Sequence, residues 1–179
     1  PLMSQEAAIE NAPTATAVPV RLGQPACYPA GDGGLNCFLE VFNDQVELLE
    51  SVSVWFGLYD QNDSLVASQV GNLTLNFLSP GGNMPVSAYF SPPVPADAMI
   101  RTQLVSALTV IDDKSRYVET EVTVDKVQID PIGLQANAAG SVAIMAPVRA
   151  VWGVALAYDL EGVIIGIRRW KQDTGCLLP

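Results

Sequence analysis

Histidine is absent from the 179 residues of this chain, and its absence narrows the chemistry available. Histidine is the usual general base, the usual metal ligand and the middle member of a Ser-His-Asp triad. Carboxylate and lysine mechanisms stay open, but an enzyme becomes a less favoured interpretation, and we expect no cofactor. The chain also has no run of about 18 apolar residues, so no segment is predicted to cross a membrane as a helix.

Basic residues are few, with 9 Lys and Arg against 19 Asp and Glu, for a net charge of −10. The deficit lies in residues 1–126, which hold 15 acidic and 5 basic side chains, whereas residues 127–179 hold 4 of each. An acidic surface repels phosphate backbones and anionic lipids. The balance therefore argues against nucleic acid as a partner, and its simplest role is solubility.

Cysteine is scarce as well, with only Cys27, Cys37 and Cys176. Proline and glycine between the first two allow a short loop to close, so we predict a disulfide between Cys27 and Cys37, with free thiols as the alternative. The spacing fits no common zinc pattern. A disulfide indicates an oxidising compartment, so the expected location is extracellular or on a cell surface.

The first 25 residues are rich in Ala, Pro and Thr and have little to bury. Such a composition predicts a flexible tether over residues 1–25. The chain starts at Pro1 without an initiator Met, so we expect a processed start and anchoring through a missing N-terminal segment.

Apolar residues make up 49% of the chain and charged residues 16%, which is enough apolar material for a packed core. From Cys37 onward the apolar residues recur with a period of two, and turn residues separate short segments. This pattern predicts an all-β protein built as a sandwich. The expected strands cover residues 37–43, 46–59, 65–70, 73–78, 85–90, 99–111 and 117–127.

The segment Phe56-Gly-Leu-Tyr-Asp60 ends one of these strands. We expect Phe56 and Leu58 to face the core and Tyr59 to pack on the opposite face, with its hydroxyl near a polar partner. Asp60 is expected to cap the following turn by accepting backbone N–H hydrogen bonds. The segment is therefore interpreted as a fold motif, without catalytic or metal-binding residues.

Tyr158-Asp159 repeats the end of this motif at a shift of 99 residues. Both dipeptides follow an apolar strand and precede a polar turn and another apolar strand, which predicts a duplication. The expected domains are residues 26–126 and residues 127–179, the second being C-terminally truncated. Its sheets would then lack strands at an edge, which missing residues or another chain would supply. One larger sandwich is the alternative.

The Phe56–Asp60 motif, followed by Pro80-Gly81 and Pro85-Val86, resembles the FxLYD domain family. The resemblance covers residues 36–126 and is weaker after 127, where Ala155 and Ala157 replace the motif's Phe and Leu. It implies tandem immunoglobulin-like or fibronectin-like β-sandwich domains on bacterial extracellular or envelope proteins, such as lipoproteins. It implies no catalytic residues.

Three other patterns have simpler interpretations. Asp60, Asn62 and Asp63 alternate oxygen ligands but lack the glycine and glutamate of an EF-hand, so a surface turn is favoured. Glu119 and Glu121 share a strand face, where paired carboxylates are usually solvated. The cluster Arg168-Arg-Trp-Lys171 is interpreted as a strand end, with binding of an anionic polymer or a partner as the alternative.

These observations favour a non-catalytic extracellular or cell-envelope module for protein binding, adhesion or spacing. It would bind an unidentified protein or cell-surface partner through a sheet face or an exposed edge strand, and an edge-strand homodimer is one such arrangement. The alternative is an accessory domain of a larger envelope enzyme or solute-binding protein. A carboxylate-dependent hydrolase is the least favoured class.

Overall fold

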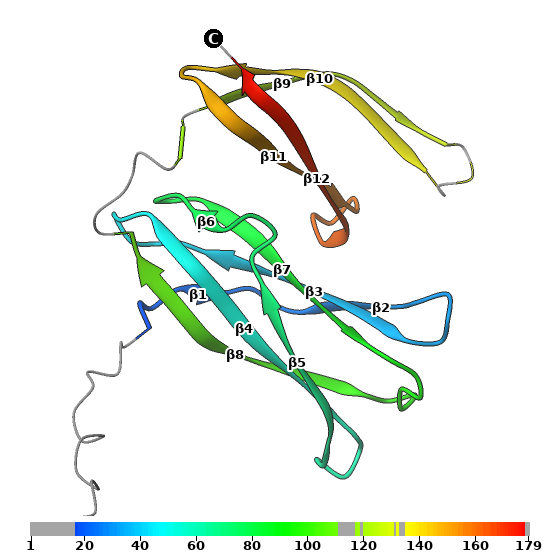
Figure 1. The fold of residues 1–179 in the computed structure, drawn as a ribbon. Coiled ribbons are helices and arrows are strands. Elements are labelled where there is room, and N and C mark those ends of the chain that lie inside the picture. The colour runs from blue at the N-terminus through cyan, green and yellow to red at the C-terminus, as the bar shows by residue number, and fades with distance from the viewer. Residues whose placement is uncertain (1–16, 111–116, 119, 131, 133–134, 178–179) are drawn as a thin grey trace, which may run out of the picture.

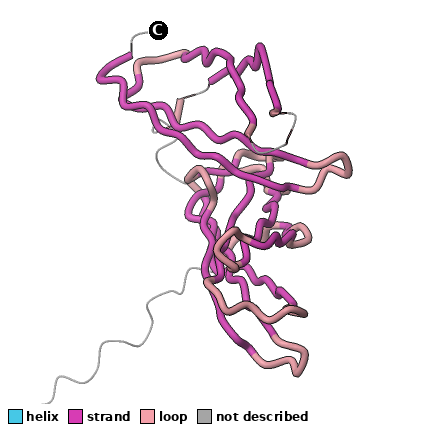
Figure 2. Tube along the Cα trace, turned by 90° about the vertical axis from the view of Figure 1, so that its right-hand side faces the viewer, coloured by secondary structure: helices cyan, strands magenta, loops and turns pink. Residues whose placement is uncertain are grey.

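The protein is all-β, as its two-residue apolar period predicts (Figures 1 and 2). The computed structural model describes residues 17–110, 117–118, 120–130, 132 and 135–177. Over these ranges the chain has no helix that is long and apolar enough to span a membrane. The strands are β1 (Arg21–Leu22), β2 (Ala26–Pro29), β3 (Leu35–Phe42), β4 (Leu49–Tyr59), β5 (Leu65–Asn72), β6 (Phe77–Leu78), β7 (Asn83–Phe90), β8 (Met99–Thr109), β9 (Thr120–Ile129), β10 (Ala136–Ile144), β11 (Val148–Tyr158) and β12 (Ile164–Leu177).

Strands β1 to β8 form two four-stranded antiparallel sheets. In one sheet β3 is central: β7 pairs along one of its edges, and β1 and β2 share the other. In the second sheet β4 is central: β8 pairs along one edge, and β5 and β6 share the other. Figure 1 shows the two sheets layered against each other, so this part of the chain is a β-sandwich.

The core lies between these two sheets, where alternate residues of β3, β4 and β7 face inward. Phe56 and Leu58 of the motif are almost fully buried, as expected, and so are Leu39 and Phe90. Burial of a large apolar side chain contributes about 1.5–3 kcal/mol, so this cluster is the main source of stability for the sandwich. The core cluster consists of Cys37, Leu39, Val41, Leu49, Val52, Val54, Phe56, Leu58, Leu73, Leu78, Val86, Ala88, Phe90 and Ala107.

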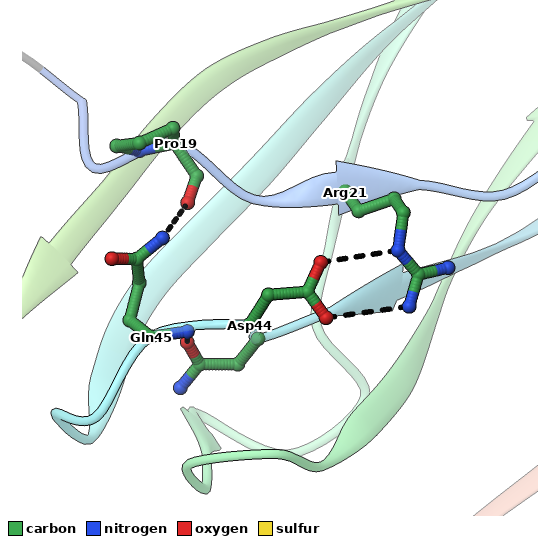
Figure 3. Close-up of polar contacts among 5 residues, drawn as sticks. Pro19, Arg21, Asp44 and Gln45 are labelled. Carbon is green, nitrogen blue, oxygen red and sulfur yellow. Dashed lines mark hydrogen bonds and ion pairs between the residues drawn. The ribbon is translucent and has the colours of Figure 1, made fainter.

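The end of the predicted tether belongs to the sandwich. Strand β1 pairs with β3, and Val18 and Val20 pack against the core. Figure 3 shows two polar contacts that hold this segment: the Arg21 guanidinium reaches the Asp44 carboxylate at 3.1 and 3.3 Å, and the Gln45 amide donates to the Pro19 carbonyl at 3.0 Å. The sandwich therefore begins before residue 26, and the rest of the tether, residues 1–16, lies outside the described residues.

The strand predicted over residues 73–78 is wrong for most of its length, because the chain changes sheets there. The Leu73 amide donates to the Val52 carbonyl in β4, and the next amide, that of Thr74, donates to the Pro85 carbonyl in β7. A segment whose successive amides serve different sheets cannot extend one regular ladder. Only Phe77–Leu78 forms a strand, and Leu73 makes an isolated bridge to Val86.

The remaining strands form two separate antiparallel hairpins, β9–β10 and β11–β12. Figure 1 shows them together on one side of the sandwich, at the C-terminal end of the colour gradient. Every residue of β9 is exposed, and Ile164 of β12 is the one buried residue among the described side chains of the two hairpins. The hairpins therefore have strand geometry without a closed core of their own.

Candidate binding site

The β11–β12 hairpin has the same register as the β4–β5 hairpin at a shift of 99 residues. The pairs from Ser53↔Asn72 to Leu58↔Ala67 recur from Trp152↔Lys171 to Ala157↔Gly166. In both hairpins the register then shifts by a bulge, and the tyrosine pairs beyond it, as Tyr59↔Leu65 and Tyr158↔Ile164. A shared bulge is a specific feature, since bulges interrupt the ladder at defined positions.

The turns that follow β4 and β11 also have equivalent hydrogen bonds. The Asp60 carboxylate accepts the Asn62 and Ser64 amides at 2.9 Å, and the Asp159 carboxylate accepts the Glu161 and Val163 amides at 3.0 and 2.7 Å. The residue three positions after each aspartate has a positive φ, 61° in Asp63 and 79° in Gly162. Asp60 thus caps its turn as predicted, Asp159 caps its turn in the same way, and the likeness supports the duplication. The division of the chain at residue 126 stays a prediction.

The two hairpins carry their large inward side chain on different strands. In the sandwich, Phe56 of β4 lies against Gly71 of β5. At the equivalent places stand Ala155 of β11 and Trp170 of β12, and the Trp170 ring covers Gly153, where a Cβ atom would lie 2.1 Å from it. The large aromatic side chain thus stands on the first strand of the β4–β5 hairpin and on the second strand of the β11–β12 hairpin. Trp170 remains 44% exposed, because no described strand covers it from the other side.

Each of the four strands at this end of the molecule has one edge without a partner among the described strands. In the sandwich, β7 pairs with the outer edge of β3 and β8 with the outer edge of β4. Within the described ranges, β10 pairs only with β9, and β11 pairs only with β12. Each hairpin thus presents a row of backbone N–H and C=O groups that another strand can pair with.

A hollow of about 1370 Å³ lies between these hairpins. Half of the residues that line it are valine, alanine or glycine, among them Val122 at 65% exposed, and Trp170 also lines it. The lining comprises Leu75, Asn76, Phe77, Tyr117, Val118, Thr120, Val122, Thr123, Val124, Ala138, Ala139, Gly140, Ser141, Val142, Ile144, Pro147, Val148, Arg149, Ala150, Val151, Trp152, Gly153, Val154, Ala155, Arg169 and Trp170. An apolar hollow bordered by free strand edges is suited to an extended peptide.

Two basic residues, Arg149 and Arg169, belong to the lining of the hollow. No carboxylate lines it among the described residues, whereas the chain carries a net charge of −10. The predicted basic-aromatic cluster is divided between the two faces of the hairpin: Trp170 lies over Gly153 on one face, and on the other the Arg169 guanidinium lies 4.2 Å and the Lys171 ammonium 5.1 Å from the Trp152 ring centre. Cations held over an indole ring in this way keep their charge near an apolar surface.

The β11–β12 hairpin is joined to the sandwich at its turn. The Tyr158 hydroxyl donates to Glu40 Oε1 at 2.9 Å, and the Asn83 amide donates to the same oxygen at 2.8 Å. Partial burial, followed by the hydrogen bond to Glu40 and the charge of that carboxylate, raises the pKa of Tyr158 to about 12. Ile164, at 4% exposed, is buried at the same end of the hairpin. Tyr158 therefore has a role at the junction that Tyr59 does not share.

The other predicted residues lie elsewhere on the sandwich. Cys27 and Cys37 pair across β2 and β3 with their Cα atoms 4.1 Å apart and form the predicted disulfide. Tyr59 packs edge-on against Trp55 at 6.5 Å between ring centres, and the Arg101 guanidinium lies 4.4 Å from the Tyr59 ring centre.

The carboxylates considered as candidate sites are surface groups. Asp63 forms an ion pair with Arg101. Glu121 is exposed on β9, and Glu119 lies outside the described residues. In the part of the chain that the structure describes, no three His, Cys, Asp or Glu side chains cluster as a metal site would require.

Comparison with protein-family models, with curated proteins and with solved structures finds no match for this chain. Sequence reasoning anticipated exposed edges in the second half, and it singled out Tyr158 and Trp170. It missed Glu40 as the junction acceptor, because Glu40 precedes Tyr158 by 118 residues and only the fold brings them together.

Proposed function

We propose that this chain is a non-catalytic β-sandwich module that binds another polypeptide. The observation that carries the proposal is the apolar hollow between β9–β10 and β11–β12, bordered by the unpaired edges of β10 and β11. A large exposed apolar surface on a protein usually marks an interaction site. Backbone groups along a free edge provide affinity, and the apolar walls select the side chains that enter.

An extracellular or cell-envelope location is part of the proposal. The Cys27–Cys37 disulfide supports it, since such bonds persist in oxidising compartments and are rare in reducing ones. The sandwich formed by β1 to β8 also supports an immunoglobulin-like module of the FxLYD kind, because Phe56 and Leu58 lie in the core and Asp60 caps the turn. The register that the β4–β5 and β11–β12 hairpins share supports tandem copies as part of the proposal.

The experiment fills the hollow and measures binding. An array of ten-residue peptides with alternating apolar and polar residues is probed with the wild-type protein and with Ala155→Trp, whose new side chain occupies the hollow. Ala96→Trp, at an exposed position in the β7–β8 connection, is the matched control. We expect peptides that bind the wild type and the control to lose at least tenfold in affinity toward Ala155→Trp. Failure of every peptide to bind, or equal binding by all three proteins, would refute the proposal.

A further inference from the structure

We propose that a cleft beside the β11–β12 hairpin binds a neutral saccharide unit of a glycan. The cleft has a volume of about 710 Å³ and lies between strands β3 and β7, the end of β5 and strand β12. Its size is within the range of small-molecule sites, roughly 300–1,000 Å³. It is distinct from the hollow that carries the proposed function, since Arg169 is the one residue that lines both.

Two cross-strand pairs of the sandwich form the floor of the cleft. Asn36 of β3 pairs with Tyr89 of β7. Two residues further along β3, Phe38 pairs with Ser87. Residues directly opposite each other point to the same face of a sheet, and here it is the outer face, because Cys37 between them belongs to the core. The register therefore places an aromatic ring beside a neutral polar side chain in each pair.

Tyr89 is fixed as a flat aromatic surface in this floor. Its hydroxyl donates to the Asp32 carboxylate, and its ring lies over Gly34, where a Cβ atom would come within 2.6 Å of Tyr89 Cε2. A ring that lies over a glycine on one side keeps its other side open, and Tyr89 is 38% exposed. The negative π face of such a ring attracts the polarised C–H groups of a pyranose.

The hydrogen-bonding side chains of the cleft are mostly uncharged. Asn36, Asn72 and Ser87 line it, and their side chains form no hydrogen bond with another residue of the described ranges. Amide and hydroxyl groups both donate and accept, as the hydroxyls of a sugar do. They can therefore exchange bonds to solvent for bonds to a polyhydroxylated ligand.

The lining disfavours other classes of ligand. Among the described residues no carboxylate lines the cleft, so the usual ligands of a calcium ion are missing. Arg169 is the one charged residue of the lining, and a single cation on a chain with a net charge of −10 does not attract a polyanion. A wholly apolar ligand would leave the amides and hydroxyls without partners. A neutral saccharide satisfies the ring and the amides together.

The test measures the binding of trisaccharides to the full chain. Maltotriose, cellotriose, mannotriose and chitotriose are the neutral probes, and trigalacturonic acid is the acidic one. Isothermal titration gives the affinity, and the chemical shifts of the Asn72 and Ser87 amides locate the bound sugar. Tyr89→Ala removes the ring and Asn72→Ala removes an amide. The matched controls are Tyr59→Ala and Asn62→Ala, which change a tyrosine and an asparagine of the β4–β5 hairpin outside the cleft.

We expect at least one neutral trisaccharide to bind, to shift the Asn72 and Ser87 amides, and to keep its affinity when salt is added. Tyr89→Ala should weaken binding about tenfold, which corresponds to about 1.4 kcal/mol. Asn72→Ala should weaken it about fivefold, as expected for one lost hydrogen bond. Both controls should bind like the wild type. Tyr89→Phe keeps the ring and should retain binding, which separates loss of the ring from loss of the fold.

Three results would overturn the inference. The first is failure of all four neutral trisaccharides to bind. The second is binding that neither Tyr89→Ala nor Asn72→Ala weakens, which would place the sugar elsewhere on the chain. The third is binding of trigalacturonic acid alone, lost in salt and in Arg169→Gln, which would replace the neutral class by an acidic one. Ala155→Trp, which fills the hollow, should leave sugar binding unchanged, so the peptide array tests the proposed function independently.

Discussion

Asp60 and Asp159 occupy the same position in two hairpins whose cross-strand registers coincide at a shift of 99 residues. Each carboxylate accepts the amides two and four positions further along the chain. The first hairpin is closed into a sandwich by β8, whereas the second borders an open hollow. The same hairpin geometry therefore contributes to a packed core in β4–β5 and to an exposed wall in β11–β12. This contrast motivates the following predictions.

Phe56→Ala should destabilise the sandwich by about 3–5 kcal/mol, because it leaves a cavity in a fully buried part of the core. The free energy of unfolding is measured by urea titration. Val122→Ala, at a position that is 65% exposed, serves as the control and should change stability by about 0.5 kcal/mol or less. A loss below about 1 kcal/mol for Phe56→Ala would contradict the assignment of Phe56 to the core.

Gly162→Ala should destabilise the β11–β12 turn by about 1–2 kcal/mol. Gly162 has a φ of 79°, where an L side chain is disfavoured even though a Cβ atom there meets no neighbour within 4 Å. Hydrogen exchange of the Val163 amide, which is bonded to Asp159, reports the opening of the turn. Gly31→Ala is the matched control, because Gly31 is equally open and lacks a positive φ. Equal effects of the two changes would show that backbone strain is not the cause.

The Tyr158–Glu40 contact should make the junction sensitive to alkaline pH. The pKa of Tyr158 is raised from an ordinary value of 10.0 to about 12, so the folded state favours the neutral hydroxyl. Its contribution is fully present below about pH 10 and is lost as the pH rises through about 12. Phenolate absorbance should therefore show one tyrosine that ionises near pH 12, and Tyr158→Phe should remove it. Titration of Tyr158 near pH 10 would argue against the contact.

Removal of the Cys27–Cys37 disulfide should lower the stability of the sandwich by about 2–3 kcal/mol. The bond closes a loop with a sequence separation of 10, and such a crosslink acts mainly by restricting the unfolded chain. The double change Cys27→Ala, Cys37→Ala is compared with the oxidised wild type by urea unfolding. A difference below about 1 kcal/mol would mean that the hairpin formed by β2 and β3 holds the loop closed without the bond.

Local patterns were sufficient to predict much of the sandwich. The alternation in residues 37–59 predicted strands with Phe56 and Leu58 inside, since a strand has a side-chain period of two. Prediction failed where long-range pairing decides the structure. Val18 and Val20 look like tether residues in sequence, but they pack against a core formed by later strands. Residues 73–78 look like one strand, but their amides divide between two sheets.

The sequence by itself determined the all-β class, the capped turn at Asp60 and the disulfide partners, because each depends on residues close together in the chain. The tertiary structure alone decided the rest. It brought Tyr158 to Glu40, placed Trp170 over Gly153, and opened an apolar hollow between the two C-terminal hairpins. These features depend on which strand edges meet across the fold, and the edges of β10 and β11 are unpaired only because no described strand lies beside them.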